Sequence, residues 1–319
     1  TRQIFHCFGC GEGGDVFQFV MMIENISFPE ALRQLADKTG IQLRDQAFER
    51  GSSDPKAKER AALYQLHEEV GKFFAEQMSS TGEGRAARAY LADRGLTGPV
   101  MGRFGLGYAP SSGHSLTRYL AQSQIPPRAI ELSGLLISES SPGGKSRYYD
   151  RFRRRIIFPI TNDKGKIIAF AGRTLGGADV SGPKYLNSPE TPIYYKSRVF
   201  YNLSNAGQAI RKAEYAVLVE GYMDSIALAS AGIGNVVASC GTSLTESQIK
   251  LLTRFTRRVV VNFDSDSAGV RATERSLDLL LEEGFEVKVL ELPEGLDPDD
   301  FLRQRGEAAY REELGRAPS

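Results

Sequence analysis

Two short apolar runs of the chain each end in a pair of acidic residues, and these pairs are the side chains best suited to do chemistry. The run AVLV precedes Glu220 and Asp224, and the run VVVNF precedes Asp264 and Asp266. A run of Val and Leu bounded by Gly predicts a buried strand. Side chains two apart in an extended chain point the same way, and a spacing of four is about one helical turn. Each pair can therefore face a single point.

A third acidic cluster follows the run VKVLEL and contains Asp297, Asp299 and Asp300. In an open α/β sheet, ligands bind outside the carboxyl ends of the strands, where all three clusters would meet. Hard divalent cations prefer oxygen ligands and keep waters that phosphates can replace. We therefore predict a Mg²⁺ site that handles phosphates. A single pair of acidic residues would be weak evidence for a metal site, because such pairs also occur in solvated turns.

From residue 214 onward, apolar runs alternate with helical patterns. We expect strands near 216–220, 235–239, 258–264 and 286–292, and helices near 223–231, 245–256 and 268–283. This alternation predicts an α/β fold, with a parallel sheet and crossover helices. Ahead of it, we expect a long helix that starts at Pro55 and two strands at 155–160 and 166–171.

Basic residues concentrate between positions 145 and 173, although the whole chain of 319 residues carries a net charge of only +1. Nine cations and two acidic residues give this segment a charge of +7; the cations are Lys145, Arg147, Arg151, Arg153, Arg154, Arg155, Lys164, Lys166 and Arg173. Lys and Arg on a sheet edge can replace the counterions of a phosphate backbone. A solvated basic face is the other interpretation.

Two neighbouring stretches bear on phosphate binding. Residues 102–108 are rich in glycine but lack the spacing of a phosphate loop, so we interpret them as turns and a short strand. Residues 183–198 combine repeated Pro with charged, amide and hydroxyl side chains, which suit the phosphate, sugar and base of a nucleotide; the candidates are Lys184, Tyr185, Asn187 and Lys196.

The N-terminal segment contains Cys7 and Cys10 in a glycine-rich turn. This spacing lets two thiolates reach one zinc ion, although a structural zinc site needs four ligands and a redox pair has the same spacing. The chain has three cysteines and no signal peptide, which favours a reducing interior, and no apolar run approaches the length of a membrane span. It begins at Thr1, so we expect a fragment of a longer protein.

The order Glu-Gly-Tyr-Met-Asp followed by Asp-Ser-Asp-Ser-Ala-Gly resembles the Toprim domain over roughly residues 214–300. The runs YDRFR, FPI, AGR and PKYLNSPET stand ahead of it, in the order of bacterial DNA primases. The amino-acid sequence around Cys7 and Cys10 resembles the second knuckle of that family's zinc ribbon. The resemblance runs nearly from end to end and implies the catalytic core of a bacterial-type DNA primase.

Such a core would copy single-stranded DNA into a short RNA primer from ribonucleoside triphosphates by metal-dependent nucleotidyl transfer. The resemblance implies catalytic roles for Glu220, Asp264 and Asp266, and metal binding by Glu220, Asp224, Asp264, Asp266, Asp297 and Asp299. It implies zinc ligation by Cys7 and Cys10, and nucleotide or nucleic-acid binding by Arg151, Arg173, Lys184, Tyr185, Asn187 and Lys196.

The implied cofactors are Mg²⁺ or Mn²⁺, with zinc in the full-length protein; zinc binding by this fragment stays open because the family's first ligand pair lies upstream. The implied partners are the DNA template, the RNA primer, ribonucleotides and a replicative helicase, the last through a further C-terminal domain, in the bacterial cytoplasm at the replication fork.

The implied fold is α/β: an α+β catalytic subdomain, then a Toprim parallel sheet, with a partial zinc ribbon at the N-terminus. We divide the chain into a partial zinc-binding module (1–44), a linker (45–55), the basic part of the polymerase core (56–213), the Toprim domain (214–300) and a helical end (301–319). A Toprim nuclease or topoisomerase, and a non-catalytic DNA-binding scaffold, are the alternatives.

Overall fold

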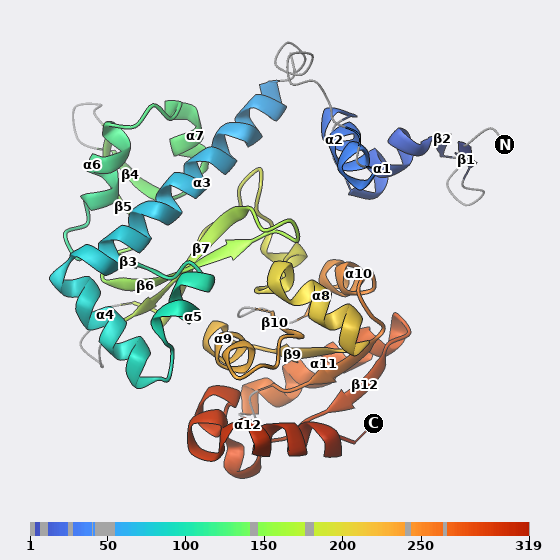
Figure 1. The fold of residues 1–319 in the computed structure, drawn as a ribbon. Helices are drawn as coiled ribbons and strands as arrows, with labels where there is room; N and C mark the ends of the chain where they lie inside the picture. Colours follow the sequence, from blue (N-terminus) through green and yellow to red (C-terminus); the bar gives the residue numbers. More distant parts are fainter. Residues whose placement is uncertain are drawn as a thin grey trace. The chain divides into compact units, whose positions relative to one another are not determined.

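The computed structural model forms two compact units, residues 1–61 and 62–319 (Figure 1). It describes residues 4–6, 12–24, 28–39, 41, 55–140, 146–175, 182–239, 244–263 and 267–318. Within these residues, no helix has both the length and the apolar character needed to cross a membrane.

The first unit contains a small hairpin and two helices. Strands β1 (Ile4–His6) and β2 (Gly13–Asp15) pair antiparallel, and α1 (Val16–Glu24) and α2 (Phe28–Thr39) follow. The side chain of Asp15 accepts a hydrogen bond from the Gln18 amide at 2.9 Å and so caps the start of α1. Cys7 and Cys10 lie outside the described residues, as does most of the predicted linker.

The second unit begins with helices that pack on an antiparallel sheet. The sheet has the order β3-β6-β7-β8. A separate hairpin, β4-β5, lies between β3 and β6 along the chain. Helix α3 starts at Pro55, as predicted, and buries the apolar side chains that keep helical spacing. The elements are α3 (Pro55–Ser80), α4 (Gly82–Asp93), α5 (Gly98–Arg103), β3 (Gly107–Ala109), α6 (Ser115–Ala121), α7 (Pro127–Leu132), β4 (Leu136–Ser140), β5 (Ser146–Asp150), β6 (Arg155–Thr161), β7 (Ile167–Thr174) and β8 (Tyr185–Asn187).

The two strands predicted in the basic segment are confirmed as β6 and β7, joined by a turn at residues 162–165. The interpretation of residues 102–108 as turns and a strand is partly wrong. Gly102 and Arg103 form the last turn of α5, while β3 lies where the short strand was expected. The helix forms because Pro99 occupies its first turn, where a missing amide hydrogen costs nothing.

The parallel sheet has the order β10-β9-β11-β12, and helices connect its strands as predicted. Side chains alternate along β9: Ala216 and Leu218 join one apolar cluster, while Val217 and Val219 join another. A strand covered on both faces needs an uninterrupted apolar run, which is what the sequence contains. The elements are α8 (Leu203–Ala213), β9 (Ala216–Val219), α9 (Tyr222–Ser230), β10 (Val236–Ala238), α10 (Glu246–Leu252), β11 (Arg258–Val261), α11 (Ser267–Glu282), β12 (Glu286–Val289) and α12 (Pro298–Arg316).

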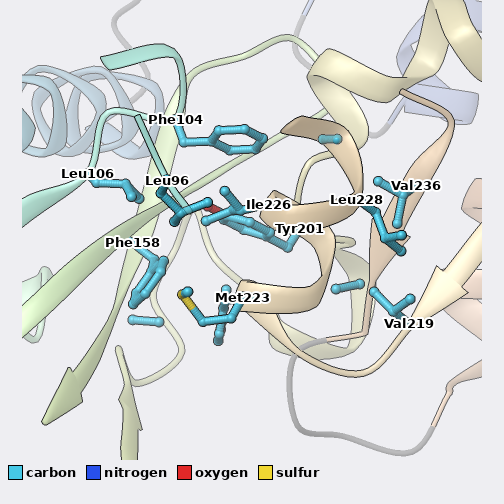
Figure 2. Close-up of a cluster of buried hydrophobic side chains, with 14 of the residues drawn as sticks. Leu96, Phe104, Leu106, Phe158, Tyr201, Val219, Met223, Ile226, Leu228 and Val236 are labelled. Carbon is cyan, nitrogen blue, oxygen red and sulfur yellow. The ribbon is translucent and has the colours of Figure 1, made fainter. Parts of the chain in front are cut away.

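Helix α9 is buried from Tyr222 to Ala229, between the antiparallel and the parallel sheets. Figure 2 shows Met223 near Phe158 of β6, whereas Leu228 lies near Val219 and Val236 of the parallel sheet. A helix that is apolar all round is stable only when it is enclosed in this way. Its first turn, which carries Asp224, is therefore held by both sheets.

The buried His67 of α3 makes the folding stability depend on pH. Its Nδ1 lies 2.8 Å from the Leu63 carbonyl oxygen, its ring stacks on Phe170, and its buried Nε2 has no hydrogen-bond partner in the described part of the chain. Burial lowers the pKa of His67 to about 4, against the opposing effect of the Leu63 carbonyl. The unfolded chain takes up this proton near pH 6.5, so folding stability decreases as pH falls from about 6.5 to about 4.

We expect this histidine to contribute a loss of about 3 kcal/mol across that interval, at 1.36 kcal/mol per pKa unit. The measurement is the free energy of unfolding by denaturant at several pH values, for the natural chain and for His67→Leu, which should lose this part of the slope. The exposed His114 provides the control substitution His114→Leu. Identical pH profiles for His67→Leu and the natural chain would contradict the prediction.

Candidate active site

The parallel sheet has its topological switch point between β9 and β11. The chain leaves β9 toward β10 on one side and reaches β11 on the other, so the carboxyl ends of β9 and β11 flank a crevice of the kind that binds ligands. Glu220 follows β9 directly and is half-buried. Asp264 and Asp266 come just after Phe263 at the end of β11, and both lie outside the described residues.

Asp224 lies in the first turn of α9, where the positive end of the helix favours a carboxylate. The position of its carboxylate depends on Gly221, because a Cβ at this position would clash with the Oδ2 of Asp224. The spacing Glu220-Gly221-x-x-Asp224 thus places one carboxylate directly after β9 and a second one in the first turn of α9, close to Gly221. The sequence analysis predicted from spacing that Glu220 and Asp224 can face a single point, but it did not predict the role of Gly221.

The third acidic cluster reaches the first through the start of α12. Asp297 caps this helix by accepting a hydrogen bond from the Asp300 amide at 2.7 Å, and Pro298 occupies the first helical position. The amide of Asp299 donates to Oδ1 of Asp224 at 3.3 Å. Asp224 and Asp299 are therefore neighbours, although 75 residues separate them.

Among the carboxylates that the structure describes, Asp299 is the most deeply buried, with 1% of its surface exposed. Burial raises its pKa, and the guanidinium of Arg94, hydrogen-bonded to Oδ2, opposes that shift. Its other oxygen, Oδ1, is buried and has no hydrogen-bond partner within the described residues. A buried carboxylate oxygen beside a second carboxylate is what a hard divalent cation requires, so the residues present fit such an ion.

A group of aromatic and cationic side chains lies beside the carboxylates. Tyr222, next to Gly221, donates a hydrogen bond to Oδ1 of Asn187 at 2.9 Å, and its ring centroid lies 5.7 Å from that of Tyr185. Arg173 is buried over the rings of Tyr185 and Tyr90, at 5.6 and 5.3 Å from their centroids. Burial raises the pKa of Tyr185 to about 12, although Arg173 acts against it. Its hydroxyl therefore stays protonated at neutral pH.

The other predicted basic residues are placed differently. The guanidinium Nε of Arg151 donates to the Gly134 carbonyl at 2.6 Å, and burial lowers its pKa. Lys184 is exposed just before β8, and Lys196 begins a short 3₁₀ helix, Lys196–Arg198. Arg155, counted in the basic segment, is buried and donates to the Gly172 and Pro183 carbonyls at 2.9 and 3.0 Å. Fewer of these cations are thus exposed than the residue count suggested.

Sequence reasoning missed Arg94 and Tyr90, which lie in and directly after α4. No local pattern marks them, because Arg94 contacts Asp299 across 205 residues and Tyr90 packs against Arg94 and the distant Arg173. The described residues contain no cluster of three or more metal-binding side chains, which is expected while Asp264 and Asp266 lie outside them.

A pocket of about 340 Å³ lies elsewhere, and its lining contains none of the predicted site residues. Several of its polar groups already bond one another or the neighbouring backbone. Asn202 donates to the Val236 carbonyl at 2.9 Å, and the hydroxyls of Thr161 and Ser204 lie 2.9 Å apart.

Comparison with known proteins gives three family matches. Residues 1–50 match the CHC2 zinc finger, residues 73–207 the N-terminal domain of the DNA primase catalytic core, and residues 217–302 a Toprim-like domain. The DNA primase of Halalkalibacterium halodurans is 43% identical over 313 residues, which cover 98% of this chain and 51% of the relative.

Solved structures agree. The Aquifex aeolicus primase, comprising zinc-binding and RNA polymerase domains, is 36% identical with a TM-score of 0.74, over 99% of this chain and 73% of that one. The chain belongs to the bacterial DNA primase family. A primase catalytic domain solved with bound single-stranded DNA is 37% identical with a TM-score of 0.73, over 82% of this chain and 80% of that one.

Membership of the primase family confirms the predicted resemblance and the mixed α/β fold. The primase core match covers the antiparallel sheet, and the Toprim-like match covers the parallel sheet with its carboxylates. Both the Toprim and the CHC2 families imply metal binding. The chain spans about half the length of the curated primases that it matches.

Proposed function

We propose that this chain is the catalytic core of a DNA primase that synthesises short RNA primers on single-stranded DNA from ribonucleoside triphosphates. The observation that carries the proposal is the contact between Asp224 and Asp299 beside the switch point of a Toprim-like sheet, where one buried Asp299 oxygen has no hydrogen-bond partner among the described residues. The reaction is attack of a ribose 3′-hydroxyl on the α-phosphate of the incoming nucleotide, with release of pyrophosphate.

Six carboxylates would hold Mg²⁺ or Mn²⁺: Glu220, Asp224, Asp264, Asp266, Asp297 and Asp299. A bound cation would lower the pKa of the attacking hydroxyl and stabilise negative charge on the phosphates. Glu220, half-buried at the end of β9, either ligates the ion or accepts the hydroxyl proton. Asp297 retains one oxygen for this task, since its Oδ1 caps α12.

The basic and aromatic residues beside the carboxylates suit the nucleic acid. Arg173, fixed between two tyrosine rings, and the exposed Lys184 would contact phosphates, while Tyr185 and Asn187 would shape the surface next to Tyr222. Arg151 and Lys196 would bind more distant parts of the template or the growing duplex. The relative solved with single-stranded DNA supports this assignment of the template.

The remaining proposals concern the whole protein. Cys7 and Cys10, within the CHC2 match, would contribute two ligands to zinc. We retain the division into a zinc-binding module, linker, basic subdomain, Toprim domain and helical end as a proposal. A replicative helicase, in the bacterial cytoplasm, is the proposed partner of the full-length primase.

Incorporation of labelled ribonucleotides on unprimed single-stranded DNA tests the function. With Mg²⁺ or Mn²⁺, we expect short RNA products that alkali destroys, and chelation of the cation should abolish them because the chain's carboxylates then have no ion to position. The same reactions without nucleotides serve as the control for DNA cleavage. Metal-dependent nicking without RNA synthesis would instead support the Toprim nuclease, and DNA binding indifferent to the cation and without products would support a scaffold.

A further inference from the structure

Arg94 links two distant parts of the second unit. It is the C-cap residue directly after α4, and its backbone amide donates to the carbonyls of Leu91 and Ala92. Its guanidinium forms an ion pair with Asp299 at the start of α12. One quarter of the Arg94 side chain is exposed, against 2% for Asp299, so the arginine approaches the buried carboxylate from the solvent side.

The two oxygens of Asp299 have different surroundings. Oδ2 accepts the hydrogen bond from Nη1 of Arg94, whereas Oδ1 is buried and has no hydrogen-bond partner within the described residues. The backbone amide of Asp299 donates to Asp224, which brings a second carboxylate to the same place. A buried, charged oxygen without a partner is costly unless a cation faces it. One oxygen of the carboxylate is thus bound by a protein cation, and the other is the oxygen that a metal ion could use.

Arg94 is itself held in place. Its guanidinium lies 5.5 Å from the ring centroid of Tyr90, one turn earlier on α4, and Arg173 lies 5.3 Å from the same centroid. Cation–π contacts of this kind restrict a guanidinium that would otherwise be mobile. The orientation of the Asp299 carboxylate is therefore set by a rigid helix end and not by solvent.

We propose that Arg94 is a positioning residue for the metal site: by binding Oδ2 of Asp299 it presents Oδ1 to the divalent cation. This inference rests on the proposed function, because it takes Asp299 to be a metal ligand. Partners that hydrogen-bond a ligating carboxylate fix its orientation, and their loss typically costs about 10- to 100-fold in metal affinity.

The sign of the effect separates positioning from simple electrostatics. A positive charge near the site repels a divalent cation, so removal of a merely adjacent arginine should leave Mn²⁺ binding unchanged or make it tighter. Removal of a residue that orients a metal ligand should instead weaken Mn²⁺ binding. Arg88 provides the matched control, since it lies on the same helix and is exposed.

The experiment is a Mn²⁺ titration of the chain, followed by the electron paramagnetic resonance signal of unbound Mn²⁺, without nucleotides or nucleic acid. We expect Arg94→Gln to weaken Mn²⁺ binding about 10- to 100-fold, Arg94→Lys to recover part of it, and Arg88→Gln to leave it unchanged or slightly tighter. Asp299→Asn sets the reference for loss of the ligand itself. Melting curves without metal establish that each variant is folded. If Arg94→Gln does not fold, the Mn²⁺ affinity of Arg94→Lys is compared with that of the natural chain instead.

Mn²⁺ binding by Arg94→Gln that equals or exceeds that of the natural chain would overturn the inference. It would also be overturned if Asp299→Asn retained full affinity, because Arg94 would then have no ligand to position. Primer synthesis by the natural chain is measured in parallel. If the natural chain makes RNA products and Arg94→Gln binds Mn²⁺ as tightly as the natural chain does, the positioning role alone is rejected. If the natural chain binds Mn²⁺ but makes no RNA products, the proposed function alone is rejected.

Discussion

Replacing Asp224 with Asn is expected to reduce ribonucleotide incorporation by roughly 10²- to 10³-fold, because metal-based stabilisation of a phosphoryl transition state is worth several kcal/mol and each 1.36 kcal/mol is a factor of ten. The substitution removes the negative charge and keeps the shape of the side chain. An asparagine oxygen can still accept the hydrogen bond from the Asp299 amide, so the contact between α9 and α12 should survive. The loss would therefore fall on cation binding and not on folding.

Ser225→Ala is the matched control for this substitution. Ser225 is the next residue of α9; it is fully buried, and its hydroxyl has no hydrogen-bond partner within the described residues. Removing an unsatisfied buried hydroxyl should leave both stability and activity close to those of the natural chain. The measurement is the initial rate of primer synthesis at saturating Mg²⁺, with Asp264→Asn as a second metal-site variant. If Asp224→Asn were as active as Ser225→Ala, Asp224 would have no place in the metal site.

Gly221→Ala is expected to lower primer synthesis about 10- to 100-fold, since a displacement of about 1 Å in a catalytic group can cost a factor of 100. The added Cβ would clash with Oδ2 of Asp224, so the carboxylate must move away from the end of β9. The backbone at position 221 is extended (φ −100°, ψ 155°), which alanine adopts readily. The effect is therefore one of contact with Asp224 and not of backbone strain.

Gly102→Ala tests whether any added methyl group has the same consequence. Gly102 lies in α5, and a Cβ there would meet no atom within 4 Å. Alanine has the higher helix propensity, so this control should be neutral or slightly stabilising. The measurements are primer synthesis and Mn²⁺ affinity for both variants. Full activity of Gly221→Ala would show that Asp224 tolerates displacement, and the position of its carboxylate would then not limit the reaction.

The geometry also explains why two sheets are needed for one site. Helix α9 carries Asp224 and is enclosed on both sides by apolar side chains, including Phe158 of the antiparallel sheet and Val219 of the parallel sheet. The same contact region brings Tyr222 against Tyr185 and Asn187. The carboxylates proposed to bind metal and the residues proposed to bind nucleic acid are thus fixed relative to one another by a shared core.

The sequence by itself determined the parallel sheet, its crossover helices and the acidic residues at the strand ends. These features are local: strands buried on both faces need continuous apolar runs, and the carboxylates follow them directly, as Glu220 follows Val219. The capping box that Thr245 and Gln248 form at the start of α10 is local as well. Periodicity and capping are encoded within a few neighbouring residues, which is why they can be read without the fold.

Only the tertiary structure decided which carboxylate oxygens are engaged and which cations are available. Asp299 meets Asp224 across 75 residues and Arg94 across 205, and Arg155 is withdrawn from the surface by carbonyls 17 and 28 residues away. Such contacts depend on how whole elements pack, and no local spacing encodes them. The physical reason is that the burial of Asp299, which raises its pKa, and the contacts of Asp299 with Arg94 and Asp224 arise only when α4, α9 and α12 pack together.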